Sequence, residues 1–155
     1  MNIKMMHYIR LAISLCAMLL LGCSPSQQGS ELGREFYRGS ILTKSERLKA
    51  YSISDQWEIF YYGTTTIHPP DLELSEYLAR NGEPMAVYIF NFLDSSRADV
   101  YFINSLDVLS DMALYKYYDY CQNTSNITKL NANLSLIKNS SWRDYYGEKR
   151  TRMPC

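Results

Sequence analysis

The 155-residue chain lacks a hydrophobic run long enough to cross a bilayer. Its apolar stretch near the start, residues 11–22, has twelve residues without a charge. As a helix it covers about 18 Å, whereas a hydrocarbon core is about 30 Å thick. The chain also lacks an excess of charge, since 16 Lys and Arg balance 16 Asp and Glu. This balance excludes the basic surface typical of nucleic-acid binding.

Motifs of the common enzyme classes are missing as well. The sequence contains no G-x-S-x-G elbow, no phosphate-binding P-loop and no G-x-G-x-x-G turn. These absences argue against the common hydrolases and nucleotide-dependent enzymes. No cofactor and no metal site is indicated. Hydrophobic residues make up 46% of the chain, which is enough for the core of one domain.

The first 22 residues have the order of a secretory signal. Lys4 and Arg10 supply a positive start without any acidic residue, and the apolar stretch follows. Removal of this segment leaves 14 basic residues (16 minus 2) against 16 acidic residues, a net charge of −2. A buried N-terminal helix is the alternative, but it gives the two cations no role.

The apolar stretch ends at Leu20-Leu21-Gly22-Cys23, which resembles the lipobox of bacterial lipoproteins. The resemblance implies cleavage before Cys23 and acylation of that cysteine, including palmitate-type chains. Stable anchoring requires more than one chain, a condition that a triacylated cysteine meets. The next residue is Ser24, which in lipoproteins of enterobacterial type implies the outer membrane; the inner membrane is the alternative. The mature protein is then expected at the periplasmic face.

Two cysteines, Cys121 and Cys155, remain for the domain in a compartment that permits disulfides. They allow one pairing, which would contribute about 3–4 kcal/mol by loop closure. Two free thiols or a metal pair are the alternatives, although the spacing fits no zinc pattern.

The mature chain divides into a lipidated, flexible tether over residues 23–34 and a helical domain over 35–155. The tether is predicted from the polar composition of residues 24–33. Helices are predicted over residues 35–50, 55–67, 71–81, 84–93, 97–120, 129–138 and 142–149. The start of the second is predicted from a capping box formed by Asp55 and Glu58. The clearest has the apolar stripe Phe102, Leu106, Leu109, Ala113, Tyr117 and Tyr120.

The predicted fold is a compact all-α bundle of about five to six helices with one disulfide. A small α+β domain is the alternative, with strands over 57–66 and 86–93, where β-branched and aromatic residues are frequent. Periodicity does not separate a buried helix from a buried strand in the apolar run at 84–93.

Residues 74–109 resemble the helix-turn-helix rhythm of HEAT-type repeats. Two short helices flank the Asn-Gly-Glu-Pro turn at 81–84, and a third helix follows the Asp-Ser-Ser turn at 94–96. The sequence shows no second copy, so it predicts one HEAT-like helix pair rather than a solenoid. The whole chain also resembles small proteobacterial lipoproteins of unassigned function.

Catalytic candidates are few. His68 is the only histidine beyond the leader, and its neighbours Ile67 and Pro69 offer neither a carboxylate nor a nucleophile. Asp107 and Asp111 lie four residues apart, so two carboxylates share one helical face, as in some hydrolases and metal sites. A solvated helix face explains the same spacing. No catalytic residue is assigned.

The remaining signal is aromatic and basic. Residues 115–120 contain four tyrosines, of which at most two fit the apolar stripe, and tyrosine and arginine are favoured at protein interfaces. The predicted partner-binding residues are Tyr115, Tyr118, Arg143, Arg150 and Arg152. Ordinary amphipathic packing is the alternative.

The sequence thus predicts a binding protein rather than an enzyme. The two roles considered are an immunity or inhibitor protein and an accessory subunit of an envelope assembly. The rival hypotheses are a periplasmic hydrolase that uses a carboxylate pair and a purely structural envelope lipoprotein.

The anchoring hypothesis is testable at one residue. In the Cys23→Ala variant we expect loss of processing at the Gly22–Cys23 bond and loss of metabolic labelling by palmitate, because the cysteine that the lipobox resemblance assigns to acylation is absent. Gel mobility and labelling measure both. Correct cleavage together with retention in the detergent phase would contradict the hypothesis.

Overall fold

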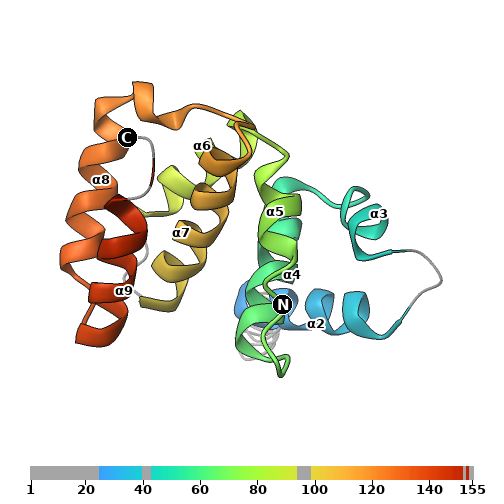
Figure 1. Ribbon diagram of the computed structural model, residues 1–155. Coiled ribbons are helices and arrows are strands. Elements are labelled where there is room, and N and C mark those ends of the chain that lie inside the picture. Colours follow the sequence, from blue (N-terminus) through green and yellow to red (C-terminus); the bar gives the residue numbers. More distant parts are fainter. Residues whose placement is uncertain (1–24, 40–42, 94–98, 152, 154–155) are drawn as a thin grey trace, which may run out of the picture.

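The computed structural model describes residues 25–39, 43–93, 99–151 and 153. Within these residues the protein is entirely helical, with eight α-helices and one 3-10 helix (Figure 1). The all-α prediction is therefore confirmed, with more helices than expected. Cys23, Arg152 and Cys155 lie outside the described residues.

The helices follow one another through short connections, and their bounds are as follows. They are α2 (Pro25–Tyr37), α3 (Lys44–Leu48), α4 (Ile53–Thr65), α5 (Leu74–Ala79), α6 (Glu83–Leu93), α7 (Asp99–Leu114), η1 (Tyr120–Gln122), α8 (Thr124–Ser135) and α9 (Ser140–Thr151). In Figure 1, α2 and α3 lie on one side of α4 and α5, and α8 and α9 lie beyond α6 and α7 on the other side.

The alternative α+β fold is wrong, because both expected strands are helices. Residues 57–66 fall in α4 and its C-cap, and residues 86–93 belong to α6. The inner face of α6 is buried through Met85, Ala86, Ile89, Phe90 and Leu93. Its outer aromatic residues, Tyr88 and Phe92, are partly covered by neighbouring rings. Because both faces of α6 carry apolar or aromatic side chains, the sequence of this helix shows no alternation of apolar and polar residues.

Side-chain caps set several helix starts, and some differ from those predicted. Ser52, not Asp55, caps α4 by accepting the backbone N–H of Asp55. Asn123 caps α8, which begins at Thr124 rather than 129, and Asn139 accepts the backbone N–H of Trp142 at the start of α9. Asn oxygen atoms satisfy N–H groups that the first helical turn leaves free.

Helix α7 ends earlier than predicted, at Leu114 rather than at residue 120. Lys116 has φ +56°, and the N–H groups of Lys116 and Tyr117 donate to Ala113 O (3.3 Å) and Met112 O (3.0 Å). This is a Schellman motif with lysine where glycine is usual. The helical stripe therefore ends with α7, although the burial expected of Tyr120 is correct: it lies in η1, is 1% exposed and donates to Leu109 O.

The core runs through the whole set of helices. Trp57 and Phe60 from α4, Ile89 from α6 and Leu106 and Leu109 from α7 are almost fully buried. Burial of side chains of this size contributes about 1.5–3 kcal/mol each. The helix-turn-helix order expected at 74–109 is present as α5, α6 and α7, while the HEAT resemblance stays a prediction.

The polar segment expected to be a flexible tether is helical from Pro25 and packs on the domain. A Cβ atom on Gly33 of α2 would lie 2.3 Å from Cγ of Tyr62 on α4, so the two helices are in close contact. The same holds in the other direction: a Cβ atom added to Gly63 of α4 would lie 2.1 Å from the hydroxyl oxygen of Tyr37 on α2. The predicted flexible conformation of the tether is therefore wrong, because this segment is part of helix α2. Its polar composition gave no sign of the two contacts between a glycine and a tyrosine that hold α2 against α4.

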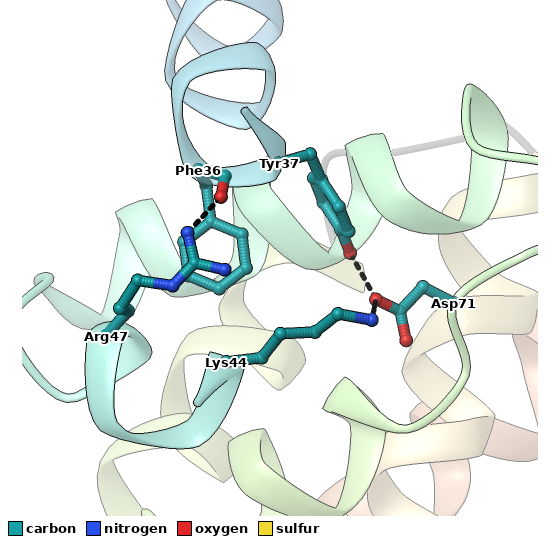
Figure 2. Close-up of polar contacts among 5 residues, drawn as sticks. All are labelled: Phe36, Tyr37, Lys44, Arg47 and Asp71. Atoms are coloured by element: carbon teal, nitrogen blue, oxygen red, sulfur yellow. Dashed lines mark hydrogen bonds and ion pairs between the residues drawn. The ribbon is translucent and has the colours of Figure 1, made fainter. Parts of the chain in front are cut away.

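A buried carboxylate completes this junction (Figure 2). Asp71, 8% exposed, accepts the hydroxyl of Tyr37 at 2.8 Å and pairs with Nζ of Lys44 at 2.6 Å. Burial and the hydrogen bond to Asp71 raise the pKa of Tyr37 well above its usual range. Arg47 donates to Phe36 O and lies over the Phe36 ring. These contacts join α2 and α3 to the connection between α4 and α5.

Close packing of α2 on α4 predicts the effect of a methyl group. Gly33→Ala should lower the free energy of unfolding by about 1–2 kcal/mol, because overpacking outweighs the gain in helix propensity. The matched control is Gly147→Ala in α9, where nothing lies within 4 Å of the added Cβ, and the expected change is a gain of up to about 1 kcal/mol.

Urea unfolding followed by circular dichroism measures both changes. If Gly33→Ala is as stable as the unaltered protein or more so, α2 does not pack on α4 in solution.

Candidate functional site

An open groove of about 1070 Å³ lies between the segment that follows α7 and helix α9. Leu114, Tyr118, Tyr145 and Met153 supply much of its apolar surface. The charged residues along it are of both signs: Lys116, Asp119, Glu148 and Lys149. The groove therefore combines exposed apolar side chains with charges of both signs.

The Schellman motif at the end of α7 creates one wall of this groove. It turns the chain at Lys116, so that Tyr117 and Tyr118 lie against the turn between α5 and α6. Gly82, with φ +60°, makes room there, because an added Cβ would lie 3.3 Å from Tyr117 O. The Tyr117 hydroxyl donates to Glu76 Oε1 at 3.0 Å. The wall is therefore held on α5 by both backbone packing and a side chain.

The four clustered tyrosines separate into different roles. Tyr120 is buried, and Tyr117 is held by Glu76. Tyr118 lines the groove, and Tyr115 is 51% exposed beside it, with its ring 5.7 Å from that of Tyr117. The structure thus places both tyrosines predicted for partner binding, Tyr115 and Tyr118, at or beside the groove.

Two of the predicted arginines lie elsewhere. Arg143 is exposed near the start of α9, and its Nη1 donates to Ile137 O at 3.4 Å. Arg150 is half-buried in α9. Burial raises the pKa of Tyr120 to about 12, and the charge of Arg150 opposes this shift. Neither lines the groove, and Arg152 lies outside the described residues. The cations that do line it are lysines.

Two apolar residues of this region were not predicted. Leu114 is 68% exposed at the end of α7, and Tyr145 is 55% exposed on α9. Next to Tyr145, Trp142 is 47% exposed and stacks on the buried Tyr146 at 5.9 Å. The aromatic spacing in 142–146 was a signal for Tyr145, because residues three and four apart share one helical face; it gave none for Leu114.

The paired carboxylates of α7 hold helices together. Asp107 forms an ion pair with Lys149 of α9 at 2.5 Å, and Asp111 accepts the hydroxyl of Ser75 on α5. Burial, opposed by Lys149, raises the pKa of Asp107. Both carboxylates are used in packing, so their geometry lends no support to a hydrolytic pair. His68 is exposed beyond the end of α4.

Cys121 lies half-buried in the groove wall. Its proposed partner, Cys155, is outside the described residues, so the disulfide stays a prediction. In the described part of the chain, no cluster of three or more His, Cys, Asp or Glu residues is arranged to hold a metal ion. Nor is any helix in that part both long and apolar enough to span a bilayer.

Comparisons with known proteins do not place the chain in a family. No protein-family model matches it, no curated protein sequence matches it, and no solved structure matches its fold. The functional argument therefore depends on the residues and their geometry.

Proposed function

We propose that this protein is a lipid-anchored, protein-binding module at the periplasmic face of the bacterial outer membrane. The lipobox at Leu20-Leu21-Gly22-Cys23 supports the anchor. The groove beside α9 supports the binding role. Its partner is a protein of the envelope or periplasm. Toward that partner the chain acts either as an immunity or inhibitor protein or as an accessory subunit of an envelope assembly.

The observation that carries the binding role is the exposure of large apolar side chains around one groove. Leu114, Tyr115 and Tyr145 are each more than half exposed within this region. Scattered exposed apolar residues are ordinary, but a group that lines or borders a groove marks an interaction site. Tyrosine and leucine side chains there bury apolar area when a partner excludes water.

The helices around the groove are held in place before a partner binds. The Asp107–Lys149 pair joins α9 to α7, and the Tyr117–Glu76 hydrogen bond holds the opposite wall on α5. A surface that is already ordered loses little conformational entropy on binding. This supports a partner that docks on a rigid face.

The beginning of α2 suggests how the face is presented. Only Ser24 separates the proposed lipid attachment at Cys23 from the first residue of α2, Pro25. Because α2 packs on α4, the domain is held close to the membrane rather than on a long linker. We infer that its partner is itself at, or brought to, the membrane surface.

Site-specific photo-crosslinking in the native envelope tests the binding role. A photoreactive residue at Leu114 or Tyr145 should give one discrete, light-dependent adduct, because both side chains face the proposed partner. The same residue at Lys49 is the matched control and should give none: Lys49 is the exposed C-cap residue of α3, and α3 lies on the other side of α4 and α5 from α9 (Figure 1).

Mass spectrometry of the adduct then identifies the partner and distinguishes a toxin or hydrolase from an assembly protein. Absence of an adduct at both groove positions, or an equal adduct at Lys49, would contradict the proposal.

A further inference from the structure

A second surface lies toward the opposite end of α7, away from the groove. Four rings from three helices are stacked in a row there: Tyr61 of α4, Tyr101 of α7, and Phe92 and Tyr88 of α6. The centroid distances are 4.1 Å for Tyr61–Tyr101, 4.6 Å for Tyr101–Phe92 and 6.3 Å for Phe92–Tyr88. All four side chains are partly exposed. We call this set the aromatic row.

The aromatic row and the groove are separate. Tyr101 is in the first turn of α7 and Leu114 is its last residue, a separation of about 20 Å along the helix axis. Trp57, which is 0% exposed, lies behind the row, with its ring 6.2–6.4 Å from those of Tyr88, Phe92 and Tyr101. The row is therefore fixed to the core and does not depend on the groove.

An acidic residue lies among these rings. Glu58 follows Trp57 on α4 and is partly buried. Burial, followed by the charge of Glu58, raises the pKa of the hydroxyls of Tyr61, Tyr88 and Tyr101, that of Tyr101 to about 12. Glu58 and Tyr61 lie three residues apart on α4, which places their side chains on one face of that helix. Burial, followed by the nearby charge of Asp55, raises the pKa of Glu58 itself.

Within the described residues, the Glu58 carboxylate takes part in no hydrogen bond or ion pair. A partly buried carboxylate without a cation is unfavourable, because it loses hydration and gains no counter-charge. A cation placed against it would restore the balance. Two other covered carboxylates do have a cationic partner: Asp71 has Lys44, and Asp107 has Lys149.

We propose that Glu58 and the aromatic row bind an arginine side chain of a protein partner. A guanidinium is planar, so it stacks on a flat ring face while its N–H groups donate in pairs to a carboxylate. The rings here are stacked on one another and do not form a box. A compact quaternary ammonium needs several ring faces directed at it, whereas an arginine needs one face and one carboxylate.

This inference goes beyond the groove and is independent of it. The two surfaces lie toward opposite ends of α7 and share no residue. Loss of arginine binding at Glu58 would leave crosslinking at Leu114 and Tyr145 unchanged, and the reverse also holds. The failure of either proposal is therefore distinguishable from the failure of the other.

Titration of the purified full-length protein in an uncharged detergent tests the proposal. The probe is Nα-acetyl-arginine methylamide at constant ionic strength, followed by the ring resonances of isotope-labelled tyrosines. We expect saturable shifts of Tyr61, Tyr88 and Tyr101 with a dissociation constant on the order of millimolar, as befits one side chain. The neutral isostere Nα-acetyl-citrulline methylamide should give no saturable shift.

Two substitutions sharpen the test. Glu58→Gln should weaken binding at least about tenfold, because the counter-charge is lost. Glu73→Gln, at an exposed glutamate preceding α5, is the matched control and should bind like the unaltered protein. Thermal unfolding should show Glu58→Gln to be no less stable, since the folded state disfavours the charge of Glu58.

The pH dependence adds a readout that a structural role would not produce. Binding should fall as the pH drops through the raised pKa of Glu58, because the protonated carboxyl carries no charge, and it should be insensitive to this range in Glu58→Gln. Equal shifts with the citrulline probe, unchanged affinity in Glu58→Gln, or no saturation with the arginine probe would each overturn the proposal. The citrulline comparison needs no variant, so it decides the matter even if a variant fails to fold.

Discussion

The packing of α2 against α4 is the constraint on which the rest of the molecule depends. Each helix offers a glycine to a tyrosine of the other: Gly33 receives Tyr62, and Gly63 receives Tyr37. The Tyr37 hydroxyl then reaches Asp71, which also binds Lys44. Glycine permits this close approach because it has no Cβ. One junction therefore fixes the first helix, α3 and the connection after α4 in a single arrangement.

Helix α7 connects the two proposed binding surfaces. Helix α7 is held by α5 through Ser75–Asp111 and by α9 through Lys149–Asp107. The groove lies at its C-terminal end, and the aromatic row with Glu58 lies near its N-terminal end. If both proposals hold, a single partner with an apolar ridge and an arginine about 20 Å apart would contact both. Alternatively, two partners would be held at a fixed separation close to the membrane.

Much of the fold was predictable from local pattern. The stripe of Phe102, Leu106 and Leu109 identified α7 because its period matches a helix. The end of α7 was not predictable, because Lys116 adopts the left-handed conformation without the glycine that usually signals it. Of the site, Tyr115 and Tyr118 were recognisable from the density of tyrosines. The exposure of Tyr145 beside the groove was not predicted, because the basic residues of α9 were the clearer signal of an interface. The role of Glu58 was not predicted either, because Tyr88 and Tyr101 come from two helices distant from it in sequence.

The central claim is that the segment directly after the proposed lipid attachment is part of the folded body. Amide hydrogen exchange on the full-length protein measures this directly. The account predicts that the amides of residues 29–37 in α2, which lie beyond the first turn, are protected and exchange with the same free energy of opening as those of α4. Exchange of α2 at the rate of an unstructured chain, while α4 stays protected, would contradict it.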